Sequence, residues 1–292
     1  MNTKLIGFDS TKSNLLASYQ NNKLPHAILI LGKKGIGKAT FARDFAMQIT
    51  KSNSDILVVE KEAEKREIGV EKIRNIKDFV NQTSAFSEDK FIIIDSACEL
   101  TRSAANSLLK ILEEPRPNNF IVLVAHNLHR VLPTIRSRCR IVRISDLSHE
   151  DFVKIVKNDA DFLAEICDNS PATALSLGAD LSRFYALFLR SILNQKISEE
   201  LLKKVADKNY SSQITEKSCE FFFSRLMKFF CGVEPKFFFE EEKVFLTLKQ
   251  KLSAEKIFKI CDESLLLLNK TQSLHLDKKL TLINIFNHFV ND

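Results

Sequence analysis

Residues 27–40 read AILILGKKGIGKAT and join a short apolar run to a glycine-rich loop. The run Ala27–Leu31 has the length and composition of a buried strand. The loop that follows holds four residues suited to phosphate binding, Gly32, Gly35, Gly37 and Lys38. Glycines let backbone N–H groups wrap a phosphate, and a lysine at the start of the next helix reaches the outer phosphates. The stretch therefore predicts a phosphate-binding loop between a strand and a helix.

The first half of the chain continues this alternation of strand and helix. Further short apolar runs lie at Ile56–Val59, Phe91–Ile94, Phe120–Val124 and Ile141–Ile144. Helix-like stretches lie between them, near residues 39–50, 70–82, 102–113 and 129–137. Continuous apolar strands separated by helices are typical of a parallel sheet that is covered on both faces. We therefore expect an α/β fold with a parallel five-stranded sheet.

After residue 145 the pattern becomes helical. Residues 148–179 predict a few short helices with a break at Ser170–Pro171, and the residues from 181 onward predict longer helices. Phenylalanines cluster at 221–223, 229–230 and 237–239, but charged residues interrupt them every few positions. This pattern favours a helical core or a helix–helix packing surface over a membrane face.

Composition narrows the class of protein. Residues 1–150 hold 23 Lys and Arg against 17 Asp and Glu, whereas the remaining residues hold 20 of each. The excess positive charge of the first half suits a phosphate-bearing partner, although a solvated surface would carry it equally well. Six cysteines without a C-x-x-C pair indicate free thiols in a reducing cytosol. Because we find neither a signal peptide nor an apolar run that could span a bilayer, we expect a cytoplasmic protein.

Two positions weaken the prediction of a magnesium–nucleotide site. Such a loop normally offers Mg²⁺ a hydroxyl directly after its lysine, but here that residue is Ala39, and Thr40 points about 100° further around the helix. Asp95 follows the strand 91–94 and would hold Mg²⁺, but the next residue, Ser96, cannot act as a base at neutral pH. A strand-end residue that caps a turn is the alternative interpretation of Asp95.

Several further stretches carry a resemblance to a known family. They are Leu24-Pro25-His26-Ala27, Ile73-Arg74, the run SAANSLLKILEEP from Ser103 to Pro115, and Thr134-Ile135-Arg136-Ser137-Arg138-Cys139. By chemistry alone the last stretch is a basic cluster at a helix end. Together, however, these stretches resemble the AAA+ subunits of bacterial sliding-clamp loaders, whose signature is Ser-Arg-Cys. The resemblance is strong over residues 20–145, weak over 146–180, and beyond 180 merely consistent with that family's helical collar.

The resemblance implies a domain division and a set of partners. It implies an AAA+ (P-loop, RecA-like) domain over residues 1–145, a small helical lid over 146–180 and an all-α collar over 181–292. In that family five subunits form an open hetero-pentameric ring, and nucleotide lies between neighbours. The implied partners are the motor (gamma/tau) and delta subunits, the β sliding clamp and primed DNA, with no membrane. Arg138 is then an arginine finger that acts in trans on the neighbour's nucleotide.

Departures from the family's pattern predict the role of the chain. Besides Ala39 and Ser96, Ala172 stands where hydrolysing members carry an arginine, and His126-Asn127 replaces a polar threonine pair. Residues 44–69 contain no cysteine for the zinc module of hydrolysing members. These losses, with Arg138 retained, fit the delta-prime role in the DNA polymerase III holoenzyme, without competent ATPase or polymerase activity in the chain itself. The implied cofactor, ATP or ADP with Mg²⁺, would be bound weakly.

Three alternatives stay open. A gamma/tau-like motor subunit that uses Thr40 would hydrolyse ATP by itself, and Lys38→Ala would abolish that activity. Another AAA+ replication or repair ATPase, such as a helicase loader, fits Ser-Arg-Cys and the run 103–115 poorly. A nucleotide-binding regulator without ring partners would remain a monomer in the presence of clamp-loader subunits.

Overall fold

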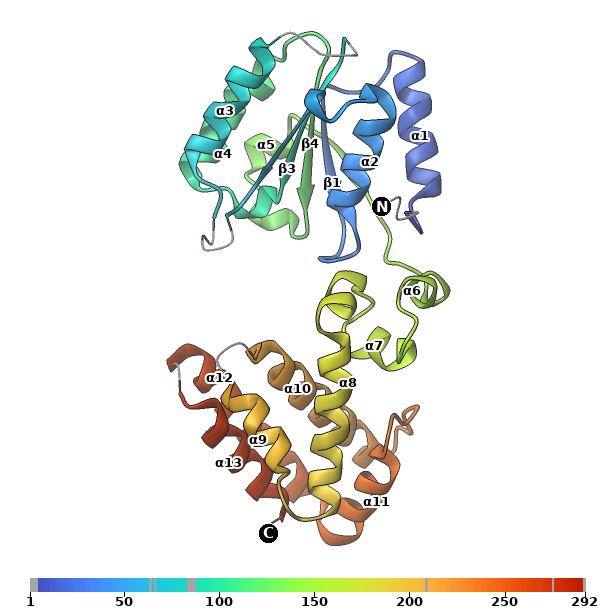
Figure 1. Ribbon diagram of the computed structural model, residues 1–292, viewed down its shortest axis with the longest axis vertical. Helices are drawn as coiled ribbons and strands as arrows, with labels where there is room; N and C mark the ends of the chain where they lie inside the picture. The colour runs from blue at the N-terminus through green and yellow to red at the C-terminus, as the bar shows by residue number, and fades with distance from the viewer. Residues whose placement is uncertain are drawn as a thin grey trace. The chain divides into compact units, whose positions relative to one another are not determined.

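Five parallel strands form a sheet at the centre of the first half of the chain (Figure 1). In spatial order they are β2 (Ile56–Glu60), β3 (Lys90–Asp95), β4 (Asn119–Ala125), β1 (Ala27–Leu31) and β5 (Arg140–Arg143). Leu29 of β1 lies in register with Leu123 of β4 on one side and Ile141 of β5 on the other. The predicted α/β fold with a parallel five-stranded sheet is confirmed, and each predicted strand overlaps an observed one.

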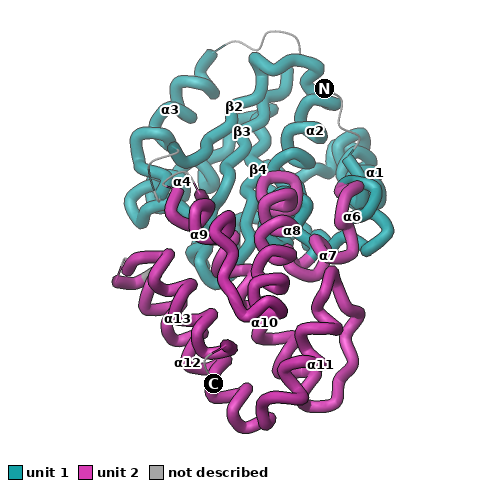
Figure 2. The backbone as a smooth tube through the Cα atoms, turned by 60° about the horizontal axis from the view of Figure 1, so that its bottom comes forward, with its two compact units in different colours: residues 1–155, 169–172 teal, residues 156–168, 173–292 magenta. Residues whose placement is uncertain are grey.

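The computed structural model describes residues 5–62, 65, 67–82, 88–207, 210–274 and 276–290. They divide into two compact units (Figure 2). The first unit comprises residues 1–155 and 169–172, and the second comprises residues 156–168 and 173–292. The predicted division at residues 145 and 180 stays a prediction, although α8 (Pro171–Leu193) runs through residue 180 without a break.

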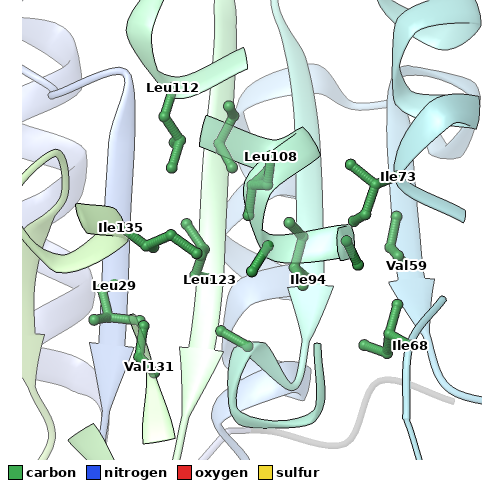
Figure 3. Packing of buried hydrophobic residues seen from close by; sticks show 14 of the residues in the cluster. Leu29, Val59, Ile68, Ile73, Ile94, Leu108, Leu112, Leu123, Val131 and Ile135 are labelled. Atoms are coloured by element: carbon green, nitrogen blue, oxygen red, sulfur yellow. The ribbon is translucent and has the colours of Figure 1, made fainter. Parts of the chain in front are cut away.

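Helices cover both faces of the sheet. They are α1 (Asp9–Gln20) and α2 (Lys38–Thr50) on one face, and α3 (Val70–Asn81), α4 (Arg102–Glu113) and α5 (Pro133–Arg136) on the other. Ile28 and Ile30 of β1 belong to the apolar cluster under α1 and α2. Leu29, between them in the chain, belongs to the opposite cluster, where Figure 3 shows it near Leu123. Because both faces are covered, the interiors of the three central strands β3, β4 and β1 are continuous apolar runs rather than alternating ones.

The helix predicted near residues 129–137 is not continuous. A single 3₁₀ turn, η3 (Leu128–Arg130), is followed by extended backbone at Val131 and Leu132, and α5 begins at Pro133. Proline disfavours helical geometry in the residue before it, while its own φ suits the first position of a helix. The other irregular elements of the first unit are η1 (Asn53–Asp55), η2 (Ala97–Glu99) and the short helix α6 (His149–Ile155).

The second unit is built from helices. They are α7 (Ala160–Ile166), most of α8, α9 (Glu199–Ala206), α10 (Ser212–Phe230), α11 (Glu241–Lys251), α12 (Ala254–Leu274) and α13 (Lys278–Val290). Phe222 and Phe223 of α10 and Phe245 of α11 are fully buried, and the rings of Phe222 and Phe245 lie 5.7 Å apart. The predicted helical core is therefore confirmed here, whereas residues 237–239 lie in the loop between α10 and α11.

A buried ion pair links the helices of the second unit. Glu241 is 0% exposed and accepts hydrogen bonds from Arg225 Nε and Nη2, each at 2.9 Å. It also accepts from the Phe238 backbone N–H at 2.9 Å and from the Tyr185 hydroxyl. Arg225 in turn contacts Glu165 of α7 at 2.5 Å. The network therefore connects α7, α8, α10 and α11 through one buried carboxylate.

None of the helices in the described part of the chain combines the length and apolar content needed to cross a membrane. All six cysteines are free thiols.

Candidate functional site

The glycine-rich loop joins β1 to α2 at the carboxyl edge of the sheet, where the strands end (Figure 1). Gly35 and Gly37 have φ angles of +81° and +100°, which side-chain-bearing residues rarely adopt. A Cβ at Gly35 would also lie 2.1 Å from the Ser170 hydroxyl, so a side chain there would force Ser170 to move. Gly37 occupies the N-cap position of α2, and the first N–H groups of that helix lack partners within it. This geometry suits an anion.

Lys38 is the first residue of α2 and is only 5% exposed. Its ammonium group donates a hydrogen bond to the Lys33 carbonyl oxygen across the loop. Burial lowers the pKa of Lys38 to about 8, and the negative charge of Asp95 partly opposes this shift. The loop lysine therefore carries a poorly solvated charge, which an anionic ligand would stabilise.

Asp95, the last residue of β3, lies opposite Glu60 of β2 and Val124 of β4. Burial raises the pKa of Asp95, the Glu60 carboxylate raises it further, and the Lys38 ammonium lowers it. The structure therefore brings two of the predicted site residues, Lys38 and Asp95, within electrostatic reach of one another. A bound cation would favour the ionised carboxylate of Asp95.

The positions that would complete a magnesium site lack the required groups. Ala39 follows Lys38 directly, and Thr40 is exposed on the surface of α2. The Ser96 hydroxyl accepts a hydrogen bond from the Cys98 N–H at 3.3 Å and so caps η2. Glu99, at the end of η2, pairs with Lys61 at 3.2 Å. The residues around the glycine-rich loop therefore fit the phosphates of a nucleotide better than they fit the Mg²⁺ that would accompany them.

His126 is a site residue that the sequence pattern marks only as a departure. It follows the last residue of β4, next to the end of β3, and its Nδ1 lies 3.5 Å from the Ser96 hydroxyl oxygen. Burial lowers the pKa of His126, and the nearby ammonium groups of Lys34 and Lys38 lower it further. The sequence does not predict that His126 lies beside Ser96, because this depends on the strand order, which makes the ends of β3 and β4 neighbours.

Residues 169–172 meet the tip of the glycine-rich loop. The Ala172 N–H donates to the Gly35 carbonyl oxygen at 3.1 Å, and a Cβ built at Gly35 would lie 3.5 Å from that of Ala172. Residue 172 is the position where the family resemblance implies an arginine in hydrolysing members. Its contact with the loop makes this a suitable place to sense a phosphate, and alanine has no group to do so.

The Ser137-Arg138-Cys139 triplet connects α5 to β5 and holds its three side chains in different surroundings. The Ser137 hydroxyl donates to the Thr134 carbonyl oxygen at 3.1 Å and tightens the turn. Cys139 packs against the apolar cluster under α4, and burial raises its pKa to about 11. Arg138, between them, is exposed and donates from Nη1 to the Thr134 carbonyl oxygen at 3.0 Å. The triplet therefore presents one arginine from an anchored turn.

Arg138 and the glycine-rich loop lie at opposite edges of the sheet. The loop follows the end of β1 and Asp95 ends β3, whereas Arg138 comes just before the start of β5. In a parallel sheet all strand starts share one edge, and a strand of five residues spans roughly 16 Å. The structure thus brings together the predicted loop residues and Asp95, but it does not bring Arg138 to them.

Comparison with known proteins gives this arrangement a family context. Residues 48–148 match the family described as DNA polymerase III, delta subunit. The DNA polymerase III subunit delta' of Pseudomonas aeruginosa is 33% identical over 135 residues, which are 39% of this chain and 41% of that protein. The resemblance to the clamp-loader family and its delta-prime subunit is confirmed.

Other members of the clamp-loader family match as well. The DNA polymerase III subunit gamma of Buchnera aphidicola subsp. Schizaphis graminum is 31% identical over 173 residues, 53% of this chain and 48% of that protein. The chain therefore spans less than half the length of these curated relatives. A solved DNA polymerase III gamma subunit-related protein of Thermotoga maritima aligns over 98% of this chain and 99% of its own, with a TM-score of 0.52 and 24% identity. That likeness supports the AAA+ fold with its helical second part.

Proposed function

We propose that this chain is a delta-prime-like subunit of a bacterial DNA polymerase III clamp loader. In this role it occupies one place in a hetero-pentameric ring with gamma/tau and delta subunits, helps to load the β sliding clamp onto primed DNA in the cytoplasm, and has no ATPase activity of its own. The observation that carries the proposal is the placement of Arg138 at the edge of the sheet opposite its own glycine-rich loop. An arginine there can serve only a nucleotide held by another subunit.

In the proposed mechanism Arg138 supplies positive charge to the phosphates of the neighbour's ATP. As the bond to the leaving group breaks, its electron pair goes to the leaving-group oxygen, and an arginine finger that stabilises the negative charge of the transition state speeds the reaction by about 10³–10⁵. The anchoring of the turn by Ser137 and Cys139 supports this role, because a finger must be presented with little freedom to be effective.

The chain's own loop is then a degenerate site. Gly32, Gly35, Gly37 and Lys38 would hold the phosphates of ATP or ADP, with Asp95 facing any accompanying Mg²⁺. When bound with Mg²⁺, such a nucleotide offers a transferable phosphoryl group. Ala39 supplies no hydroxyl to the metal, Ser96 supplies no base, and Thr40 is exposed on the surface of α2. Nucleotide bound here would therefore remain intact.

The test is ATP turnover by the loader reconstituted from this chain and its partner subunits, stimulated by clamp and primed DNA. Arg138→Ala should slow turnover without impairing assembly, since one of the ring's sites loses its finger. Arg136→Ala, a neighbouring arginine of the same turn, is the matched control and should leave the rate unchanged. Lys38→Ala should also leave it unchanged. If Lys38→Ala slows turnover as much as Arg138→Ala does, the chain is itself a motor subunit of the gamma/tau type.

A further inference from the structure

Arg138 is held within its own chain by a carboxylate of α4. Its Nη2 lies 2.7 Å from Glu113 Oε1, while its Nη1 contacts the Thr134 carbonyl oxygen at 3.0 Å and the Ser137 hydroxyl at 3.4 Å. Glu113 is the last residue of α4, a helix that packs against α5. Both terminal nitrogens of the guanidinium therefore have partners inside the chain.

Glu113 can be displaced because this ion pair is open to solvent. The side chains of Arg138 and Glu113 are 36% and 48% exposed. An ion pair between exposed side chains shifts an equilibrium by about fivefold or less. A bidentate contact with a phosphate uses the same two terminal nitrogens of the guanidinium and is charge-assisted. A triphosphate also carries more negative charge than one carboxylate, so exchange of Glu113 for phosphate is favourable.

We propose that Glu113 is a positioning residue that holds Arg138 in a resting place until a phosphate takes over its guanidinium. This inference rests on the proposed function, since under that function the guanidinium of Arg138 leaves Glu113 to bind a phosphate of the neighbour's nucleotide. In the resting ring Glu113 and the neighbour's nucleotide compete for Arg138. Glu113 thereby lowers the turnover of a loader that has not yet met its clamp and DNA, and it has no effect once the ring has closed on them.

The neighbouring residue offers a matched control. Glu114 is also exposed and carries the same charge, but it lies at the C-cap of α4, where its backbone N–H bonds to the Lys110 carbonyl oxygen. Glu113→Gln and Glu114→Gln therefore change the charge of the chain equally, and only Glu113→Gln removes the carboxylate that contacts Arg138. Neither position is buried, so both variants should fold like the parent chain, which far-ultraviolet circular dichroism would verify.

The experiment compares ATP turnover of the reconstituted loader without and with clamp and primed DNA. Glu113→Gln should raise the basal rate about two- to fivefold and leave the stimulated rate unchanged, while Glu114→Gln should match the parent. The difference should shrink as salt is added, because exposed charges are screened. In an Arg138→Ala background, Glu113→Gln should have no effect.

Two results separate the failure of this inference from that of the proposed function. If Arg138→Ala leaves turnover unchanged, Arg138 is not a finger and the proposed function fails together with the role of Glu113. If Arg138→Ala slows turnover but Glu113→Gln has the same basal rate as the parent or a lower one, Arg138 is still an arginine finger, but Glu113 does not hold it in a resting place.

Discussion

Replacing Glu241 with glutamine would test what holds the second unit together. The carboxylate of Glu241 receives four hydrogen-bond donors, because Oε1 accepts from the Tyr185 hydroxyl and Arg225 Nε, and Oε2 accepts from Arg225 Nη2 and the Phe238 N–H. An amide has one oxygen and one NH₂ group. If the NH₂ of Glu241→Gln takes the place of Oε2 it faces two N–H donors, and if it takes the place of Oε1 it faces the Arg225 Nε–H, while the Tyr185 hydroxyl can turn to accept from it.

The expected loss in the free energy of unfolding follows from these contacts. The variant leaves Arg225, whose side chain is 7% exposed, without its fully buried counter-ion and with the half-exposed Glu165 as its remaining carboxylate. Removing one partner of a buried ion pair costs about 3–5 kcal/mol. Because Glu165 and the Lys236 carbonyl oxygen still contact Arg225, we expect a loss near the lower end, about 3 kcal/mol.

Urea denaturation followed by far-ultraviolet circular dichroism measures this loss, because the chain has no tryptophan to report unfolding by fluorescence. The control is Glu240→Gln at the preceding residue, which pairs with Arg190 at 3.1 Å on the surface. An exposed pair contributes about 0–1 kcal/mol. If the two variants lower the free energy of unfolding equally, the buried network does not stabilise the second unit and the reasoning is wrong.

Three further predictions concern the first unit. Gly35→Ala should lower the free energy of unfolding by about 1–3 kcal/mol in urea denaturation because of its positive φ and lack of space. Gly69→Ala, with φ of −76° and open space, should cost less, because it loses only the preference of the α3 N-cap for glycine over alanine. Because the pKa of Lys38 is lowered to about 8 by folding, the unfolded chain binds one more proton than the folded chain between about pH 8 and 10.5. The free energy of unfolding of the parent should therefore rise with pH across that window, by up to about 3 kcal/mol relative to Lys38→Met, as measured by denaturation at each pH. Iodoacetamide should alkylate the exposed Cys231 well before Cys139, whose pKa is raised to about 11; equal rates by mass spectrometry would contradict the anchored turn.

The strands and the glycine-rich loop could be predicted because their signals are local. Buried parallel strands are continuous apolar runs, and the loop lies directly between the first run and a helix. By contrast, α1 (Asp9–Gln20) has one buried residue, Leu15, and so shows no apolar stripe from which a helix could be predicted. The helix expected near 129–137 is interrupted, because its basic and apolar residues fit a helical pattern while Pro133 restricts the residue before it, so that only α5 (Pro133–Arg136) is α-helical.

The contacts of the candidate site depend on strand order, which a single sequence does not contain. Ser96 and His126 are 30 residues apart and meet because β3 and β4 are neighbours. Arg138 and Glu113 meet because α4 and α5 cover the same face and both lead to the starts of strands. The sequence shows that these four residues are present, but only the fold shows that they lie next to one another in pairs.

The position of the two functional elements on one sheet constrains how a ring could be built. The glycine-rich loop lies at the carboxyl edge, and Arg138 lies at the amino edge. Under the proposed function, Arg138 must therefore meet a neighbour's loop through a head-to-tail contact, because two copies of the same edge would place two arginines or two loops together. Head-to-tail contacts form rings or open helices rather than closed pairs. In such a ring a subunit can lose its own nucleotide chemistry, as Ala39 and Ser96 indicate, and still be needed by the subunit that its Arg138 reaches.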